Sequence, residues 1–286
     1  MSGTPFLKMN GLGNDFVIVD ARESGQRFSA DAVRRISDRA LGIGADQFIV
    51  LEKPQTPGVD VFMRIYNADG GEIDACGNAS RCVAALLAEE MGKQAILLQT
   101  NAGLLPAEVF GEVVTVDIGR PRFDWDQIPL AEEFADTTGI ELQIGPIDAP
   151  ILHTPSVVNV GNPHAIFWLK DDPDNYDLGR FGPLLENHPM FPERANISLA
   201  QVIGRDRIKV RTWERGVGLT RACGTAACAT AVAAARKKLT GRKVTIELPG
   251  GPLQLTWREG DDHILMTGPW ALDGDGVLPD EMVKAA

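Results

Sequence analysis

The chain has 286 residues, 44% hydrophobic and 23% charged, a composition typical of a globular protein with room for two domains. Its net charge of -11 and its scattered Lys and Arg residues argue against a nucleic-acid-binding surface. The longest apolar run, residues 226–235, is too short to span a bilayer, and the first residues lack the pattern of a signal peptide. Four cysteines without a secretory context are typical of reduced thiols, so we expect a cytoplasmic protein.

The first half of the chain predicts strands interrupted by two helices. Ser29 is a suitable N-cap for a helix that ends near residue 40, before Gly42. A second helix is expected from residue 77 to residue 91, where Gly92 ends it. Strands are expected at residues 6–9, 16–20, 47–51, 59–66, 95–100, 105–109 and 113–118.

Residues 120–129, which include two prolines, interrupt this pattern and predict a domain boundary. We expect an N-terminal domain of residues 1–120, joined by the C-terminal tail 269–286, and a C-terminal domain of residues 121–268. In the second half, helices are expected near residues 182–187 and over 224–239. Strands are expected at residues 156–160, 165–169, 197–202, 208–214, 244–248, 253–257 and 263–267.

The order of strands, helix and strands occurs twice, which indicates a duplicated fold. Because the helices do not alternate regularly with the strands, a doubly wound parallel sheet is not expected. The helix over residues 224–239 is almost all alanine, and a helix that is small and apolar on all sides is buried. We therefore predict an α/β protein of the α+β type, in which each half is a curved sheet around one central helix.

Two five-residue motifs, Ala75–Ala79 and Ala222–Ala226, share the pattern Ala-Cys-Gly-polar-Ala, and each opens a predicted helix. The free N–H groups and the dipole of a helix N-terminus favour the reactive thiolate of Cys76 or Cys223. The same N–H groups attract a carboxylate, and a glycine after the cysteine lets the backbone approach it closely. If the duplicated fold brings the motifs together, a thiol stands on each face of the carbon beside that carboxylate.

Two thiols on opposite faces of one carbon suit a stereochemical inversion that needs no cofactor and no metal. One thiolate removes the α-proton, and the opposite thiol donates a proton to the other face. Because an α-proton is a very weak acid, the site must exclude water and direct fixed dipoles at the carboxylate. Cys82 and Cys228 lie inside the predicted helices, so we expect them to be buried structural residues. The cysteine spacings do not match a zinc site.

Beyond the two cysteine motifs, further motifs occur in the order found in the diaminopimelate epimerase family, which the chain resembles from about Phe6 to Trp270. These motifs are Lys8–Phe16, Gly42–Gln47, Asn67–Gly70, Gly161–His164, Arg194–Asn196 and Trp213–Gly216. The resemblance implies two similar domains related by a pseudo-twofold axis, each with a mostly antiparallel sheet, and an active site between them. It also implies a homodimer that interconverts LL- and meso-diaminopimelate without a cofactor, on the route to lysine and peptidoglycan precursors.

The resemblance implies a role for each site residue. Cys76 is the base toward the LL isomer and Cys223 is the acid, with the roles exchanged in reverse. His164 and Glu214 tune the pKa values of the two cysteines. The implied substrate-binding residues are Gly77, Asn78, Gly224 and Thr225 for the reacting α-carboxylate, Asn67, Asn162, Asn196 and Arg215 for the distal head, and Asn14, Gln47 and Glu214 for the rest of the pocket.

Taken singly, an asparagine beside a glycine-rich turn, such as Asn14 or Asn67, is typical of a turn residue. Only the resemblance favours binding roles for the whole set. Two positions depart from the family's pattern: Asn10, where many members have His, and Ala79, where many have Gly. Neither is an implied chemical group, so the departures concern local turn geometry and packing.

Three other functions stay open. A proline or hydroxyproline racemase acts on a substrate with one ionic head, which would leave Asn162, Asn196 and Arg215 without a purpose. A non-catalytic amino-acid-binding protein of the same fold would bind its ligand without exchanging the α-proton. Two facing thiols could also close into an inactivating disulfide under oxidation.

Overall fold

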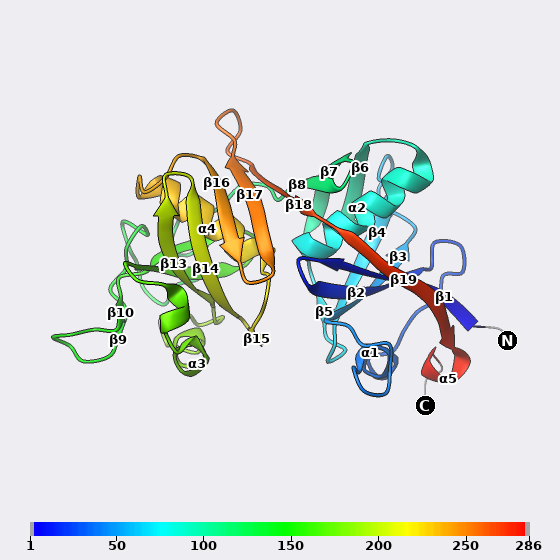
Figure 1. Ribbon diagram of the computed structural model, residues 1–286, viewed down its shortest axis with the longest axis horizontal. Helices are drawn as coiled ribbons and strands as arrows, with labels where there is room; N and C mark the ends of the chain where they lie inside the picture. The colour runs from blue at the N-terminus through cyan, green and yellow to red at the C-terminus, as the bar shows by residue number, and fades with distance from the viewer. Residues whose placement is uncertain (1–2, 284–286) are drawn as a thin grey trace. The chain divides into compact units, whose positions relative to one another are not determined.

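The computed structural model describes residues 3–283, which fold into two compact units. The first unit comprises residues 3–117 and 268–283, and the second comprises residues 118–267. Each unit contains one long helix with strands beside it (Figure 1). Within residues 3–283, none of the helices combines the length and the hydropathy that a membrane span requires.

In the first unit, the strands form a sheet in which β2–β3 and β4–β6 are parallel pairs and the other pairs are antiparallel. Its strands are β1 (Gly3–Gly11), β2 (Asn14–Asp20), β3 (Gln47–Glu52), β4 (Val61–Asn67), β5 (Glu72–Ile73), β6 (Ala95–Thr100), β7 (Gly103–Phe110), β8 (Val113–Asp117) and β19 (Ala271–Pro279). Its helices are α1 (Ala30–Ser37), α2 (Gly77–Met91) and α5 (Asp280–Val283).

In the second unit, β12–β13 and β14–β16 are the parallel pairs, and β9 and β10 form a small separate sheet. Its strands are β9 (Gln143–Ile144), β10 (Leu152–His153), β11 (Ser156–Asn159), β12 (Pro163–Leu169), β13 (Asn196–Gly204), β14 (Arg207–Glu214), β15 (Gly218–Leu219), β16 (Lys243–Leu248), β17 (Gly251–Trp257) and β18 (Ile264–Pro269), whose last two residues belong to the first unit. Its helices are the 3₁₀ helix η1 (Pro173–Asn175), α3 (Leu178–Glu186) and α4 (Gly224–Arg236).

The two units repeat one order of pairing. An antiparallel pair, β1–β2 or β11–β12, is followed by a short helix and a parallel neighbour, β3 or β13. The next strand is antiparallel, a two-residue strand follows, and the long helix leads to a second parallel neighbour, β6 or β16. The predicted α/β class and its duplication are therefore confirmed, whereas the pseudo-twofold relation stays a prediction.

The long helix of each unit lies against its strands. Helix α2 contacts β1, β6, β7 and β8, and α4 contacts β11, β12, β13, β16 and β17. Ten of the thirteen residues of α4 are buried, because their small side chains let the surrounding strands approach closely. Cys82 and Cys228 are fully buried inside these helices, as expected, and burial raises the pKa of Cys82 to about 12.

Some helix ends match the prediction and others do not. Helix α2 begins and ends as predicted, with Gly92 in the left-handed conformation, and Ser29 caps α1. In contrast, α1 ends at Ser37 because Asp38 is extended and its carboxylate accepts from two backbone N–H groups beyond it. Helix α4 ends at Arg236, before Lys238 adopts a φ of 60°.

Helix α3 begins four residues earlier than predicted, because the Asp177 carboxylate accepts from Arg180 N at 3.1 Å and caps it. The helix also contains Pro183, and because proline is disfavoured inside helices, the sequence did not predict a helix of this length.

The C-terminal tail forms strand β19, which the sequence pattern did not predict. It pairs antiparallel with β1, from Gly3 opposite Pro279 to Asn10 opposite Ala271. A Cβ atom at Gly276 would lie 2.8 Å from the Phe6 ring, so glycine at this position leaves room for the ring where it now lies. Pairing with β1 thus imposes the extended conformation on a segment rich in Gly and Asp, which are weak strand formers.

Candidate active site

Cys76 and Cys223 are the N-cap residues of the two long helices. Both have extended backbone, and neither side chain caps its own helix. Gly77 and Gly224 are the first helical residues, as the shared motif predicts. Each cysteine is therefore held at the positive end of a buried helix, where N–H groups can receive an anion.

A tight turn brings Asn14 to Cys76. Gly11 and Asn14 are paired across the turn between β1 and β2, so Leu12 and Gly13 are its two central residues, with φ of 59° and 79°. Positive φ at both central positions is the type I′ geometry that matches the twist of a hairpin. Asn14 Oδ1 accepts from Asn78 Nδ2 at 3.2 Å and lies 3.9 Å from Cys76 Sγ.

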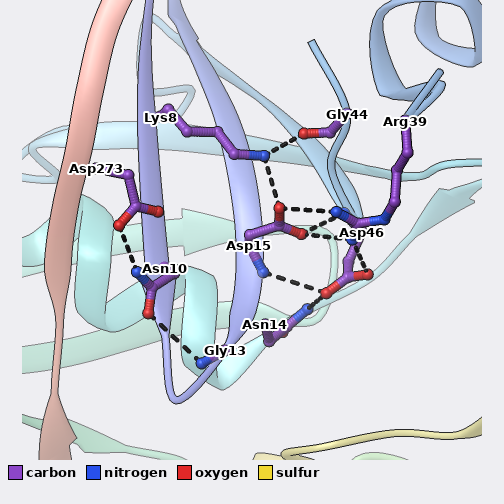
Figure 2. A network of polar contacts seen from close by, with 9 residues as sticks. All are labelled: Lys8, Asn10, Gly13, Asn14, Asp15, Arg39, Gly44, Asp46 and Asp273. Atoms are coloured by element: carbon purple, nitrogen blue, oxygen red, sulfur yellow. Dashed lines mark hydrogen bonds and ion pairs between the residues drawn. The ribbon is translucent and has the colours of Figure 1, made fainter. Parts of the chain in front are cut away.

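The turn is held by Asn10, one of the two departures from the family's pattern. Asn10 Nδ2 donates to Asp273 Oδ1 at 2.7 Å, and its Oδ1 accepts from Gly13 N at 3.4 Å (Figure 2). The other departure, Ala79, is fully buried in α2. The role of Asn10 is thus to tie the turn to β19.

Gln47 and Asn67 lie directly opposite each other on β3 and β4. Gln47 Nε2 donates to Asn67 Oδ1 at 3.1 Å. Within residues 3–283, Gln47 Oε1 is buried and has no hydrogen-bond partner. A buried acceptor of this kind is suited to an ammonium group of a ligand, because leaving it unpaired is costly.

The Cys223 thiol is buried and faces two oxygen-bearing side chains. Its Sγ lies 3.5 Å from Thr225 Oγ1. Burial raises the pKa of Cys223 well above its usual value, and the Glu214 carboxylate raises it further, whereas the N–H of Ala226 in the first helical turn lowers it. The expected lowering of the pKa by the helix start is therefore outweighed, and Cys223 is a neutral thiol.

Glu214 and Arg215 follow at the end of β14. The Glu214 carboxylate accepts from the Thr220 hydroxyl. Asn196 Oδ1 accepts from Arg215 N at 2.9 Å, and Asn196 Nδ2 donates to Pro163 O at 3.0 Å. Asn196 is buried, and its amide connects β13 with the Pro163 carbonyl and the Arg215 N–H group of the second unit.

His164 is fully buried on β12, one residue after Pro163. Its Nε2 donates to Asn162 Oδ1 at 2.7 Å, which places the ring proton on Nε2. Burial, with a smaller contribution from Arg215, lowers the pKa of His164 to about 3. His164 is therefore neutral at physiological pH.

Glu186 was not found by sequence reasoning. This buried residue of α3 accepts from Trp213 Nε1 at 2.7 Å and from Gly216 N at 2.8 Å, and it pairs with Arg194 at 3.2 Å. It therefore fixes both sides of the turn that carries Arg215. The only signal in the sequence is an acidic residue beside the apolar pair Leu184–Leu185.

The site residues occupy equivalent positions in the two units. Asn14 opens the second strand of its unit, and Asn162 directly precedes the second strand of the other. Gln47 and Asn196 open the third strands, and Asn67 and Glu214 end the fourth. Register supports this alignment: β2 pairs Phe16 with Gln47, and β12 pairs His164 with Asn196. The helix starts then match as Cys76 with Cys223 and Asn78 with Thr225.

The residues predicted for the site thus fall into two groups. The first unit holds Asn14, Gln47, Asn67, Cys76, Gly77 and Asn78, and the second holds Asn162, His164, Asn196, Glu214, Arg215, Cys223, Gly224 and Thr225. Among the residues that the structure describes, no group of three His, Cys, Asp or Glu side chains is arranged to hold a metal ion.

Solved structures of low identity share this fold. A hydroxyproline epimerase from Agrobacterium vitis, solved with trans-4-hydroxy-L-proline, has a TM-score of 0.67 at 17% identity, with 96% of this chain and 90% of that chain covered. A phenazine biosynthesis protein of the PhzF family from Bacillus anthracis has a TM-score of 0.64 at 17% identity, with 98% and 100% covered. At these identities the likeness shows the fold alone.

The family model described as diaminopimelate epimerase matches residues 6–123 and 156–272. A diaminopimelate epimerase from Afipia carboxidovorans is 57% identical over 285 residues, covering 98% of this chain and 97% of the relative. One from Nitrobacter hamburgensis is 58% identical over 278 residues, covering 96% and 94%. Because the model and these relatives extend through both units, the chain belongs to the diaminopimelate epimerase family.

Proposed function

We propose that this protein interconverts LL- and meso-diaminopimelate, with Cys76 and Cys223 as the two groups that exchange protons with the substrate. The observation that carries the proposal is the repeated placement of a cysteine at the N-terminus of the central helix in each unit. The high identity to diaminopimelate epimerases supports the choice of substrate. The product would serve the synthesis of lysine and of peptidoglycan precursors.

In the proposed reaction, one thiolate removes the α-proton and the opposite thiol donates a proton to the other face of the carbon. The buried, protonated state of Cys223 suits the donor role in the direction that starts from the LL isomer. Cys76, which is half-buried, then acts as the base. In the reverse direction the two thiols exchange roles.

The negative charge that develops on the α-carboxylate needs fixed donors in a site without water. We assign this task to the N–H groups at the two helix starts, with the side chains of Asn78 and Thr225 beside them. Because the glycines 77 and 224 carry no side chain, the backbone can approach a carboxylate there.

A second subsite distinguishes diaminopimelate from substrates with one ionic head. The Arg215 guanidinium is suited to a two-point contact with the distal carboxylate. The unpaired oxygen Gln47 Oε1 is suited to an ammonium group. The amides of Asn67, which contacts Gln47, and of Asn162 can bind either an ammonium group or a carboxylate. A site that hydrogen-bonds both heads rejects ligands that lack one of them.

The two residues assigned to pKa tuning act in different ways. Glu214 acts through its charge, because its carboxylate raises the pKa of Cys223. His164 is neutral, so we infer that it acts by orienting Asn162 through the Nε2–H bond. We also propose that the enzyme works as a cytoplasmic homodimer without a cofactor, as its family membership favours.

The test is an incubation of the purified protein with LL-diaminopimelate in heavy water. We expect the meso isomer to form with one deuterium at the inverted carbon, while unreacted LL isomer stays protonated at early times. This follows because the proton removed by one thiol is not the one returned by the other. Absence of any exchange would indicate a binding protein, and turnover of proline or 4-hydroxyproline alone would contradict the proposed substrate.

A further inference from the structure

In the first unit, a row of hydrogen bonds runs from the Arg81 guanidinium to the Asp46 carboxylate. Arg81 Nη2 lies 3.0 Å from Asn78 Oδ1, and Asn78 Nδ2 lies 3.2 Å from Asn14 Oδ1. Asn14 Nδ2 lies 2.9 Å from Asp46 Oδ2 (Figure 2). Two neutral amides are therefore placed in series between a guanidinium and a carboxylate.

The two end charges determine the direction of both amides. A guanidinium only donates, so it selects the oxygen of Asn78, and a carboxylate only accepts, so it selects the nitrogen of Asn14. Reversing either amide would oppose donor to donor or acceptor to acceptor at about 3 Å. The only arrangement that satisfies all three contacts turns Asn14 Oδ1 toward Cys76, whose Sγ lies 3.9 Å away.

We propose that Arg81 and Asp46 are positioning residues, which act through Asn78 and Asn14 to hold a carbonyl acceptor against the Cys76 thiol. The inference rests on the proposed function, because it concerns the thiol assigned there as a base. A hydrogen bond that the S–H group donates to a carbonyl oxygen stabilises the neutral thiol relative to the thiolate. This relay of hydrogen bonds from Arg81 to Asp46 therefore favours the thiol form of Cys76 over the thiolate.

Both ends of the relay are firmly held. Arg81 is fully buried in α2, three residues after Asn78, and its Nε donates to Pro269 O at 3.2 Å. Asp46 uses its second oxygen, Oδ1, for Arg39 at 2.7 Å, while Oδ2 also accepts from Asp15 N at 3.2 Å. Neither charged group can turn away from its amide without losing these other contacts.

Charged side chains also surround the relay. Those joined to it or to its neighbours by hydrogen bonds are Lys8, Arg39 and Arg81, with Asp15, Asp46 and Asp273. Burial raises the pKa of Asp15, but hydrogen bonds from Arg39 and Lys8 outweigh it and hold that pKa well below its usual value. Asp15 therefore stays ionised and keeps Arg39 in place beside Asp46.

The test measures the alkylation of Cys76 by iodoacetamide as a function of pH, with peptide mass spectrometry to identify the modified cysteine. In Asp46→Ala, only the contact from Asn78 still selects the orientation of the Asn14 amide, so the Asn14 carbonyl is held less firmly beside Cys76. We expect the pH midpoint of alkylation to fall by about 0.7 unit, which is on the order of a fivefold faster reaction below the midpoint. In Asp46→Asn, which keeps a neutral acceptor for Asn14, we expect a smaller shift in the same direction.

The matched control is Asp273→Ala, which removes a carboxylate of the same network that holds Asn10 and not Asn14. It should leave the midpoint unchanged. A faster rate at every pH with an unmoved midpoint would mean that Asp46 only shields the thiol, and would overturn the proposal. An unmoved midpoint in Asp46→Asn together with an unfolded Asp46→Ala would overturn it as well. Because alkylation needs no turnover, this result is independent of the exchange experiment in heavy water.

Discussion

At the scale of single residues, the two cysteines share a position but not an environment. Cys223 is 5% exposed and faces a carboxylate, so its thiol form is strongly favoured. Cys76 is half-buried, and its Sγ lies 3.9 Å from the neutral Asn14 carbonyl oxygen. One duplicated motif therefore places its two thiols in different electrostatic surroundings.

Neutral, buried His164 makes the stability of the protein depend on pH. Its pKa falls from 6.5 to about 3 on folding. Its contribution to the unfolding free energy is therefore complete above pH 6.5 and is lost as the pH falls toward 3, because the unfolded chain then binds a proton that the folded chain does not. Between pH 7 and pH 5, the wild type should lose about 2 kcal/mol more unfolding free energy than His164→Gln, whose side chain cannot titrate. Urea unfolding at both pH values measures this, and equal losses would show that His164 is not buried as a neutral group.

At the scale of elements, the residues of the proposed site lie at helix starts and strand ends, and the turns between strands position two of them. The type I′ turn after β1 presents Asn14, and the turn after β14 presents Arg215. Both turns are fixed by side chains from other elements, Asn10 in the first unit and Glu186 in the second. Such anchors limit the freedom of a loop that must meet a substrate in one orientation.

Removing the Glu186 carboxylate tests the anchor of the second turn. In Glu186→Ala, the indole N–H of Trp213 and the backbone N–H of Gly216 lose their acceptor, so we expect a loss of about 1–3 kcal/mol of unfolding free energy. We also expect KM for diaminopimelate to rise more than kcat falls, because the turn carries Arg215.

The control is Glu193→Ala, which removes an exposed carboxylate nearby and leaves the backbone carbonyl that accepts from Arg215 Nη1. Its unfolding free energy should change by less than about 0.5 kcal/mol. Equal behaviour of the two variants in urea unfolding and in steady-state kinetics would show that Glu186 does not anchor the turn.

At the scale of the whole molecule, the duplicated topology was readable from the sequence because the two cysteine motifs repeat and each long helix has local start signals. Strand β19 was not, because its Gly- and Asp-rich segment is extended only through its pairing with β1. The positioning residues Asp46, Arg81 and Glu186 were also missed, since each acts through contacts with segments distant in the chain. No local sequence pattern distinguishes such a residue from a charged side chain that has no positioning role.

The central claim is that each thiol acts on one face of the same carbon, and the single-cysteine variants test it most directly. With Cys223→Ala and with Cys76→Ala, α-hydrogen exchange is measured in heavy water with each isomer separately. We predict that neither variant epimerises, that Cys223→Ala exchanges only the LL isomer, and that Cys76→Ala exchanges only the meso isomer. Epimerisation by either variant, or exchange of both isomers by one thiol, would contradict the account.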